Sequence, residues 1–157
     1  MAACLPKMHE PFTQWGHEGL TYVDAIKFDY QRNRDYLIEI MSQEGSYPMK
    51  PSIAEGGYFL MADISACEEL IPKKYLESHD YLPEDEMVGA NRIFNADGTI
   101  PLDLAFCRWM ACENGLVMMP NSFFYDANGP NMTDTHVRLA LCKNFESLKA
   151  GAAKLKM

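Results

Sequence analysis

Arg138 is the residue whose position in the sequence points most directly to chemistry. It lies at the centre of residues 136–142, where apolar side chains alternate with others in a way that predicts a β-strand. A buried guanidinium without a partner is prohibitively costly, so Arg138 must meet an acidic side chain or an anionic ligand. Its planar fork of N–H donors matches a carboxylate bidentately. The pattern alone also permits a partly exposed edge-strand arginine with an ordinary surface partner.

Other reactive side chains do not form a recognisable motif. The four histidines lack the HxxxH and HExxH spacings, and Cys107 and Cys112 have no second pair to complete a zinc site. Five cysteines at irregular spacing also disfavour a disulfide framework. Cys107, Cys112 and Cys142 lie among apolar residues, which is typical of small buried hydrophobic side chains rather than nucleophiles. We therefore predict no metal site and no catalytic residue in this chain.

The helices and strands that position Arg138 can be predicted from the spacing of apolar residues and from the places where proline or glycine interrupts them. The pattern predicts helices over residues 19–44, residues 101–115 and the residues after Asn144. It predicts strands over residues 56–64, 116–119 and 136–142. The resulting fold class is α/β (α+β), a two-layer sandwich in which helices pack on a small mixed β-sheet.

Composition narrows the class of protein further. The chain has 157 residues, enough for one domain, and a formal net charge of -8 at pH 7. Without a basic surplus it is not expected to bind nucleic acid through phosphates. No apolar run is long enough for a membrane span, and the first residues resemble neither a signal peptide nor a transit peptide. These features predict a cytoplasmic protein that acts neither in a membrane nor on nucleic acid.

One stretch stands apart from this pattern. Residues 68–100 hold eight acidic and three basic residues, two prolines and little periodicity. We interpret them as a long acidic insertion with at most one short helix. Residues 1–18 are interpreted as an N-terminal extension or a remnant of another domain, and residues 19–157 as the domain itself.

Several segments together resemble a known family. They are Glu55-Gly56-Gly57-Tyr58-Phe59 followed by Asp63, the helix around Trp109, the turn Pro120-Asn121-Ser122-Phe123-Phe124, and Val137-Arg138-Leu139. Their order resembles the C-terminal small domain of class I/II pyridoxal-phosphate (PLP) aminotransferases, closest to the kynurenine aminotransferase and cysteine-conjugate β-lyase group. The resemblance covers most of residues 15–157 apart from the acidic stretch.

The resemblance implies particular roles. The arginine matching Arg138 binds the α-carboxylate of the amino-acid or keto-acid substrate, and the aromatic residue matching Phe59 lies near the substrate pocket. For Ser122 and Phe124 a structural turn is the expectation. The complete enzyme would be a homodimer that holds PLP, with a large domain as the partner of this one.

The resemblance also implies what is absent. The family holds PLP as a Schiff base on a lysine in a Ser/Thr-x-x-Lys context, and none of the nine lysines has Ser or Thr three residues earlier. The residues that hold the cofactor ring belong to the large domain. This chain alone is therefore predicted to hold no cofactor and to be inactive.

Two functions remain open at this point. The first is the carboxylate-binding domain of a kynurenine aminotransferase-like enzyme, which catalyses aminotransfer or β-elimination. The second is a stand-alone, non-catalytic carboxylate-binding or protein-interaction module that uses the acidic stretch as its contact surface. The surface that would meet a large domain distinguishes them: it should be apolar in the first and polar in the second.

Overall fold

The computed structural model describes residues 5–11, 18–77, 95, 99–125 and 132–157. The helices and helical turns are η1 (Leu5–His9), α1 (Tyr22–Met41), η2 (Ser65–Leu70), α2 (Lys73–Glu77), α3 (Leu102–Trp109), the π-helical turn η5 (Met110–Asn114), η6 (Ser122–Phe124), α4 (Phe145–Ala152) and η7 (Ala153–Leu155). The strands are β1 (Lys50–Pro51), β2 (Phe59–Asp63), β3 (Met119–Pro120) and β4 (His136–Ala140). None of the helices in these ranges is both long and apolar enough to cross a membrane.

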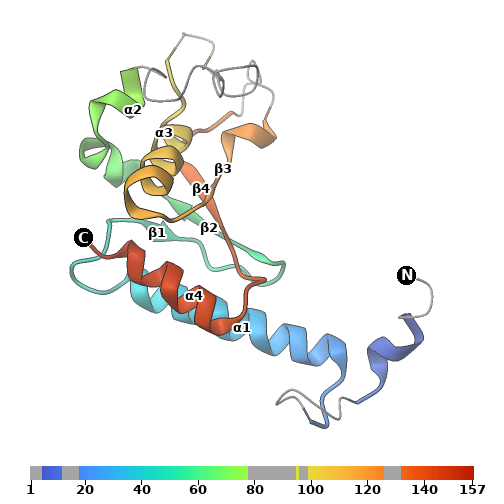
Figure 1. The fold of residues 1–157 in the computed structure, drawn as a ribbon. Coiled ribbons are helices and arrows are strands. Elements are labelled where there is room, and N and C mark those ends of the chain that lie inside the picture. The colour runs from blue at the N-terminus through green and yellow to red at the C-terminus, as the bar shows by residue number, and fades with distance from the viewer. Residues whose placement is uncertain (1–4, 12–17, 78–94, 96–98, 126–131) are drawn as a thin grey trace.

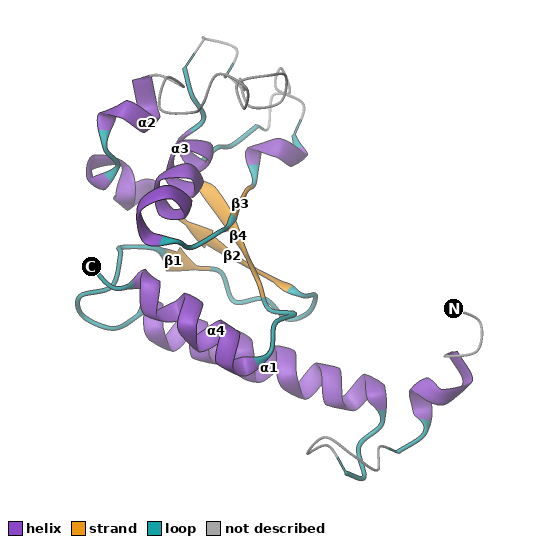
Figure 2. Ribbon diagram, in the orientation of Figure 1, coloured by secondary structure: helices purple, strands orange, loops and turns teal. Residues whose placement is uncertain are grey.

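The four strands form one sheet in the order β1-β2-β4-β3 (Figures 1 and 2). Its centre is the pairing of β2 with β4, which joins Phe59 to Ala140 and Asp63 to His136. All three strand pairs are antiparallel, so the predicted fold class is confirmed but the sheet is antiparallel rather than mixed. Side-chain alternation shows which residues share a face, but it does not show in which direction the neighbouring strand runs.

The two faces of the sheet differ in what covers them. Leu60, Ala62, Val137 and Leu139 belong to a core that also includes side chains from α1, α3 and α4. The alternate residues of β2 and β4 are half-buried and lie outside this core; they are Phe59, Met61, Asp63, His136, Arg138 and Ala140. We call this second surface the open face.

Helix α1 confirms the helix predicted over residues 19–44, with narrower bounds. Thr21 caps it, because its hydroxyl oxygen accepts a hydrogen bond from the Asp24 backbone N–H. Four apolar side chains of the helix are buried, Ala25, Leu37, Ile40 and Met41. Its C-terminal half lies beside α4, while its N-terminal half extends past it (Figure 1). The last helix is also confirmed, since Asn144 caps α4 by accepting from the Ser147 backbone N–H at 2.8 Å.

The strand predicted over residues 116–119 is largely wrong. The strand β3 covers only Met119–Pro120, and the side chain of Val117 is 84% exposed. The preceding helix continues through the π-helical turn to Asn114, and Gly115 then takes a left-handed conformation with φ of 68°. Residues 116–118 therefore cross back to the sheet as irregular chain, and pairing begins only at Met119.

The acidic stretch of residues 68–100 is described only in part. It begins within η2, continues into α2, and from residue 78 to residue 98 only Asn95 lies within the described residues. Glu113 anchors α2, since its carboxylate pairs with the Lys74 ammonium at 2.7 Å and accepts hydrogen bonds from Tyr75 and Trp109. The domain boundaries predicted at residue 18 and around the acidic insertion stay predictions.

Candidate functional site

Arg138 lies on the open face because it alternates with two core residues, Val137 and Leu139. The register of the sheet places Met61 opposite it on β2 and Met119 opposite it on β3. The guanidinium therefore rises from the middle of the sheet between two methionines. The edge-strand alternative does not apply, since β4 has a neighbouring strand on both sides.

Two contacts fix the plane of the guanidinium. Its Nε donates a hydrogen bond to Oδ1 of Asn121 at 3.0 Å. Its central carbon lies 3.7 Å from the centre of the Phe124 ring, which places the cation over the aromatic face. Within the described residues no carboxylate forms an ion pair with Arg138, and its two terminal nitrogens have no hydrogen bond to another residue. Its charge is therefore oriented by the protein but not neutralised there.

A buried aspartate holds the turn that carries both contacts. Asp103 of α3 is fully buried, and its two oxygens accept hydrogen bonds from the Ser122 backbone N–H at 2.6 Å and the Ser122 hydroxyl at 2.8 Å. Burial raises the pKa of Asp103 to about 6, although the bonds from Ser122 work in the opposite direction. Asp103 thus connects α3 to the turn that positions Arg138. This role of Asp103 was not predicted from the sequence.

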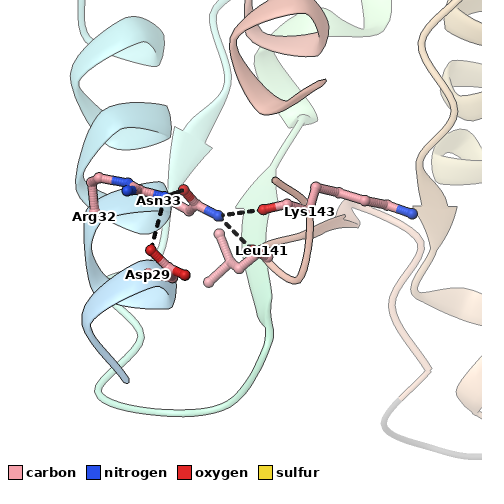
Figure 3. A network of polar contacts seen from close by, with 5 residues as sticks. All are labelled: Asp29, Arg32, Asn33, Leu141 and Lys143. Carbon is pink, nitrogen blue, oxygen red and sulfur yellow. Dashed lines mark hydrogen bonds and ion pairs between the residues drawn. The ribbon is translucent and has the colours of Figure 1, made fainter. Parts of the chain in front are cut away.

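Asn33 fixes the other end of β4. Its side chain is fully buried, and its amide nitrogen donates to the carbonyl oxygens of Leu141 at 2.8 Å and Lys143 at 2.9 Å (Figure 3). The Leu141 N–H in turn donates to the Tyr58 carbonyl oxygen at 2.8 Å. Because helix α1 holds the chain just after β4, it limits how far the strand can shift. This role of Asn33 was not predicted from the sequence either.

Phe59 lies on the same face as Arg138. It is the register partner of Ala140, two residues further along β4, which makes Phe59 a diagonal neighbour of Arg138. Its half-buried ring contacts the Tyr58 ring with centroids 4.6 Å apart. The structure therefore brings the two predicted substrate-binding residues together on neighbouring strands, while their roles stay predictions.

A charged row runs beside Arg138 on the open face. Asp63 pairs in register with Lys50 on one side and His136 on the other. The Ser65 hydroxyl and then the Ser65 backbone N–H lower the pKa of Asp63, with smaller contributions from His136 and Lys50. The hydrogen bonds from Ser65 therefore favour the ionised form of Asp63 and fix the position of its carboxylate.

Apolar groups surround the arginine. Met119 and Phe124 are 42% and 55% exposed, and the same turn exposes Phe123 and Tyr125. Large apolar side chains in one exposed area indicate a surface that meets a partner or a ligand. This exposed apolar area lies beside the charged row on the open face.

The described cysteines occupy two environments. Cys67 and Cys107 are buried, and burial raises the pKa of both thiols, that of Cys67 to about 12. They are small core residues rather than nucleophiles. Cys112 and Cys142 are exposed, so the burial expected of them from the sequence is wrong. Within the described ranges no group of three His, Cys, Asp or Glu residues is placed to hold a metal ion.

Comparison with known proteins identifies the family of this arrangement. The sequence is 31% identical to human kynurenine–oxoglutarate transaminase 1 over 126 residues, which cover 80% of this chain and 24% of the relative. It is 30% identical to the mouse protein of the same name over 150 residues, or 96% of this chain and 29% of the relative. The chain is homologous to part of the kynurenine–oxoglutarate transaminases. The resemblance seen in the sequence is therefore confirmed. No family model matches the chain.

Solved structures confirm the fold. Bna3p of Saccharomyces cerevisiae, described as a candidate kynurenine aminotransferase, superposes with a TM-score of 0.60 at 21% identity over 86% of this chain and 27% of its own. YbdL of Escherichia coli, described as having a methionine aminotransferase function, gives a TM-score of 0.50 at 25% identity over 80% and 24%. The chain thus spans about a quarter of the length of the transaminases and aminotransferases it matches.

Aminotransferases of this family use PLP, and the lysines of this chain do not fit its attachment. All nine lysines lie within the described residues; eight are exposed, and Lys149 is partly exposed and paired with Glu146 at 2.9 Å. A Schiff-base lysine needs a desolvated, enclosed amine. None of these lysines lies in such an environment in this structure.

Proposed function

We propose that this chain contributes the substrate-carboxylate site of a PLP-dependent aminotransferase of the kynurenine–oxoglutarate transaminase type. The observation that carries the proposal is the geometry of Arg138. Asn121 and Phe124 orient its guanidinium, and its terminal nitrogens are available to a ligand. Such a fork binds a carboxylate through two parallel hydrogen bonds.

The arrangement suits recognition of an amino or keto acid. Because Asn121 uses the Nε donor, the two terminal nitrogens remain to bind the α-carboxylate end-on. Fixing the carboxylate fixes the direction of the adjacent Cα, which lowers the entropic cost of the reaction. Phe59, on the same face, would line the part of the pocket next to the carboxylate. The same binding would serve aminotransfer and β-elimination, since both act at a substrate with an α-carboxylate.

The remaining chemistry would come from a large domain and from a homodimeric partner. PLP, when bound there, supplies the electron sink for charge that develops at Cα. The lysine that holds it must also come from outside this chain. The exposed Met119 and Phe124 support the proposal, because a large domain packed over the open face would remove them from water. With no cofactor attachment point of its own, this chain alone should not transaminate.

Carboxylate binding by the chain itself tests the proposal. We would titrate the protein with 2-oxoglutarate and follow the Nε–H signal of Arg138 by ¹H–¹⁵N NMR. We expect Arg138→Gln to weaken binding about tenfold or more, and Arg138→Lys to retain only part of it, because lysine has the charge without the fork. Arg108→Gln, an arginine change on α3, is the matched control. Equal binding by wild type and Arg138→Gln would disprove the assignment.

The size of the protein in its source cells tests the need for a large domain. An antibody against residues 68–100 should detect one species well over twice 17.8 kDa. A band at 17.8 kDa alone would instead favour the stand-alone module, and carboxylate binding at Arg138 would then be its activity to test.

A further inference from the structure

A cavity lies beside the sheet, away from the guanidinium of Arg138. It has a volume of about 320 Å³, is open to solvent on one side, and is lined by residues 116–118, the end of β4, α1, α4 and η7. Five leucines line it, Leu37, Leu116, Leu139, Leu148 and Leu155. Lys143 and Ser147 are its two polar side chains, and Arg138 does not line it. Its size is at the lower end of the range for ligand pockets, about 300–1,000 Å³.

The cavity exists because β3 is short. Continuing the register of β3 and β4 would pair Met118 with Leu139 and Val117 with Ala140. Residues 116–118 do not form that ladder, and Val117 is 84% exposed. The edge of β4 at residues 139–140 is therefore uncovered, and the space beside it forms the cavity.

This uncovered edge leaves a backbone donor in the cavity wall. The Leu141 N–H bonds to Tyr58 on the β2 side, while the His136 carbonyl accepts from Asn121 on the β3 side. Antiparallel alternation therefore directs the N–H and C=O of Ala140 toward the β3 side, where the chain forms no strand. No hydrogen bond from residues 116–118 reaches Ala140 within the described part of the chain. An unpaired backbone donor of this kind favours a ligand oxygen.

Lys143, an exposed residue that also lines the cavity, carries a positive charge. Its backbone is fixed, because the carbonyl oxygen accepts from Asn33, and Figure 3 shows its side chain extending away from that contact. Within the described residues no carboxylate pairs with its ammonium group. Ser147 adds a hydroxyl from the first turn of α4. The cavity thus combines aliphatic walls with a cation, a hydroxyl and a backbone N–H.

We infer that this cavity binds a small monocarboxylate with an apolar tail, such as a medium-chain fatty acid, with the carboxylate at Lys143 and the tail against the leucine wall. A neutral alcohol would contact the leucine side chains but would leave the Lys143 ammonium without a counter-charge. A dicarboxylate would place its second charge among aliphatic side chains, which is costly. The inference rests on a different surface from the proposed substrate site and does not depend on it.

Octanoate is the probe that tests this inference. We expect saturable binding of octanoate to the full chain by calorimetry or NMR, and weaker binding of octanol and of succinate. Lys143→Gln should weaken octanoate about tenfold and leave octanol unchanged, because it removes only the charged partner. The matched control is Lys154→Gln, an exposed lysine in η7 that does not line the cavity.

A second variant fills the cavity. Gly151 lines it, and a Cβ at this position would lie in ordinary contact with Leu116 at 3.5 Å. Gly151→Leu should therefore abolish octanoate and octanol binding alike, while leucine favours the helix more than glycine does. Circular dichroism verifies the fold of each variant.

Arg138→Gln separates the two carboxylate sites. Octanoate binding that survives Arg138→Gln, weakens about tenfold in Lys143→Gln and is lost in Gly151→Leu supports the inference. Octanoate binding that is lost in Arg138→Gln but unchanged in Lys143→Gln would overturn it, since the ligand would then occupy the first site. Absence of saturable binding to the wild-type chain would overturn it as well.

Discussion

Arg138 is held by an amide, not by a carboxylate: its Nε donates to Oδ1 of Asn121 at 3.0 Å. Its place in an apolar strand predicts that this arginine has a partner, either an acidic side chain or an anionic ligand. Asn121 orients the guanidinium without neutralising it, so the charge remains for a ligand. A structural ion pair would have consumed that charge. The choice of amide over acid is therefore what makes this arginine a candidate for substrate binding.

The role of Asn121 can be tested by two substitutions. Asn121→Ala frees the guanidinium, and we expect 2-oxoglutarate binding to weaken about threefold to tenfold, on the scale of one hydrogen bond. Asn121→Asp keeps the contact but adds a negative charge beside Arg138, so binding should weaken further. NMR titration of both variants measures this order. Tighter binding by Asn121→Asp than by Asn121→Ala would contradict the account.

Asn33 should be among the most sensitive polar residues for stability. Asn33→Ala would leave the buried carbonyl oxygen of Leu141 and the partly buried one of Lys143 without their donor, which we expect to cost about 2–3 kcal/mol in the free energy of unfolding. Asn33→Asp should cost more at neutral pH, because a carboxylate faces the oxygens of Leu141 and Lys143, and should recover partly at low pH as it is protonated. Urea denaturation measures both. Gln31→Ala, an exposed change on the same helix, should have little effect.

The raised pKa of Asp103 should make the free energy of unfolding depend on pH. Because its folded pKa of about 6 lies above the value of about 3.9 for an unfolded chain, the folded state binds the proton more tightly. This contribution is fully present below about pH 4 and is lost as the pH rises to about 6; two pKa units correspond to about 3 kcal/mol at most.

Asp103→Asn supplies the comparison. Its amide can still accept from the Ser122 N–H and donate to the Ser122 hydroxyl, but it does not titrate. The difference in unfolding free energy between wild type and Asp103→Asn should therefore change from about pH 4 through about pH 6 and become constant only well above that range. A difference that is independent of pH across this range would refute the assignment.

The helices could be predicted from sequence because local signals determine them. In each of α1 and α4, the capping residue and the apolar stripe lie close together in the sequence. Thr21 caps α1 and Asn144 caps α4. The direction of strand pairing and the length of β3 could not be predicted, because both depend on contacts across the sheet. The irregular path of residues 116–118 follows the π-helical turn, which no simple periodicity marks.

In the candidate site, too, some residues could be predicted from the sequence and others could not. Arg138 was predictable, because a cation in an apolar strand conflicts with its surroundings, and Phe59 followed from the family resemblance. The residues that support the site were not. Asp103 and Asn33 bind partners 19 and 108 residues away in the chain, so each looks like an ordinary helix residue in the sequence. A buried polar residue on a helix is distinguished from a surface one only when its long-range partner is known.

Glu113 should control the local stability of α2, from which the chain enters the undescribed part of the acidic stretch. The Lys74 contact is the main reason that the pKa of Glu113 lies below its usual value, with a further contribution from Trp109. The anchor should therefore be present above the ordinary range of a carboxyl group and be lost as the pH falls below it. Glu113→Ala removes the partner of Lys74, Tyr75 and Trp109 at once.

Hydrogen exchange measures this anchor. We expect Glu113→Ala to speed backbone amide exchange in residues 73–77 several-fold and to leave exchange in α4 unchanged, because it affects a local opening rather than global unfolding. Glu146→Ala, which also removes an exposed carboxylate from a lysine contact, is the matched control and should leave residues 73–77 unaffected. If both variants change α2 equally, Glu113 is not its anchor. If only Glu113→Ala speeds exchange in residues 73–77, then the carboxylate of Glu113 in η5 is what holds α2 against α3.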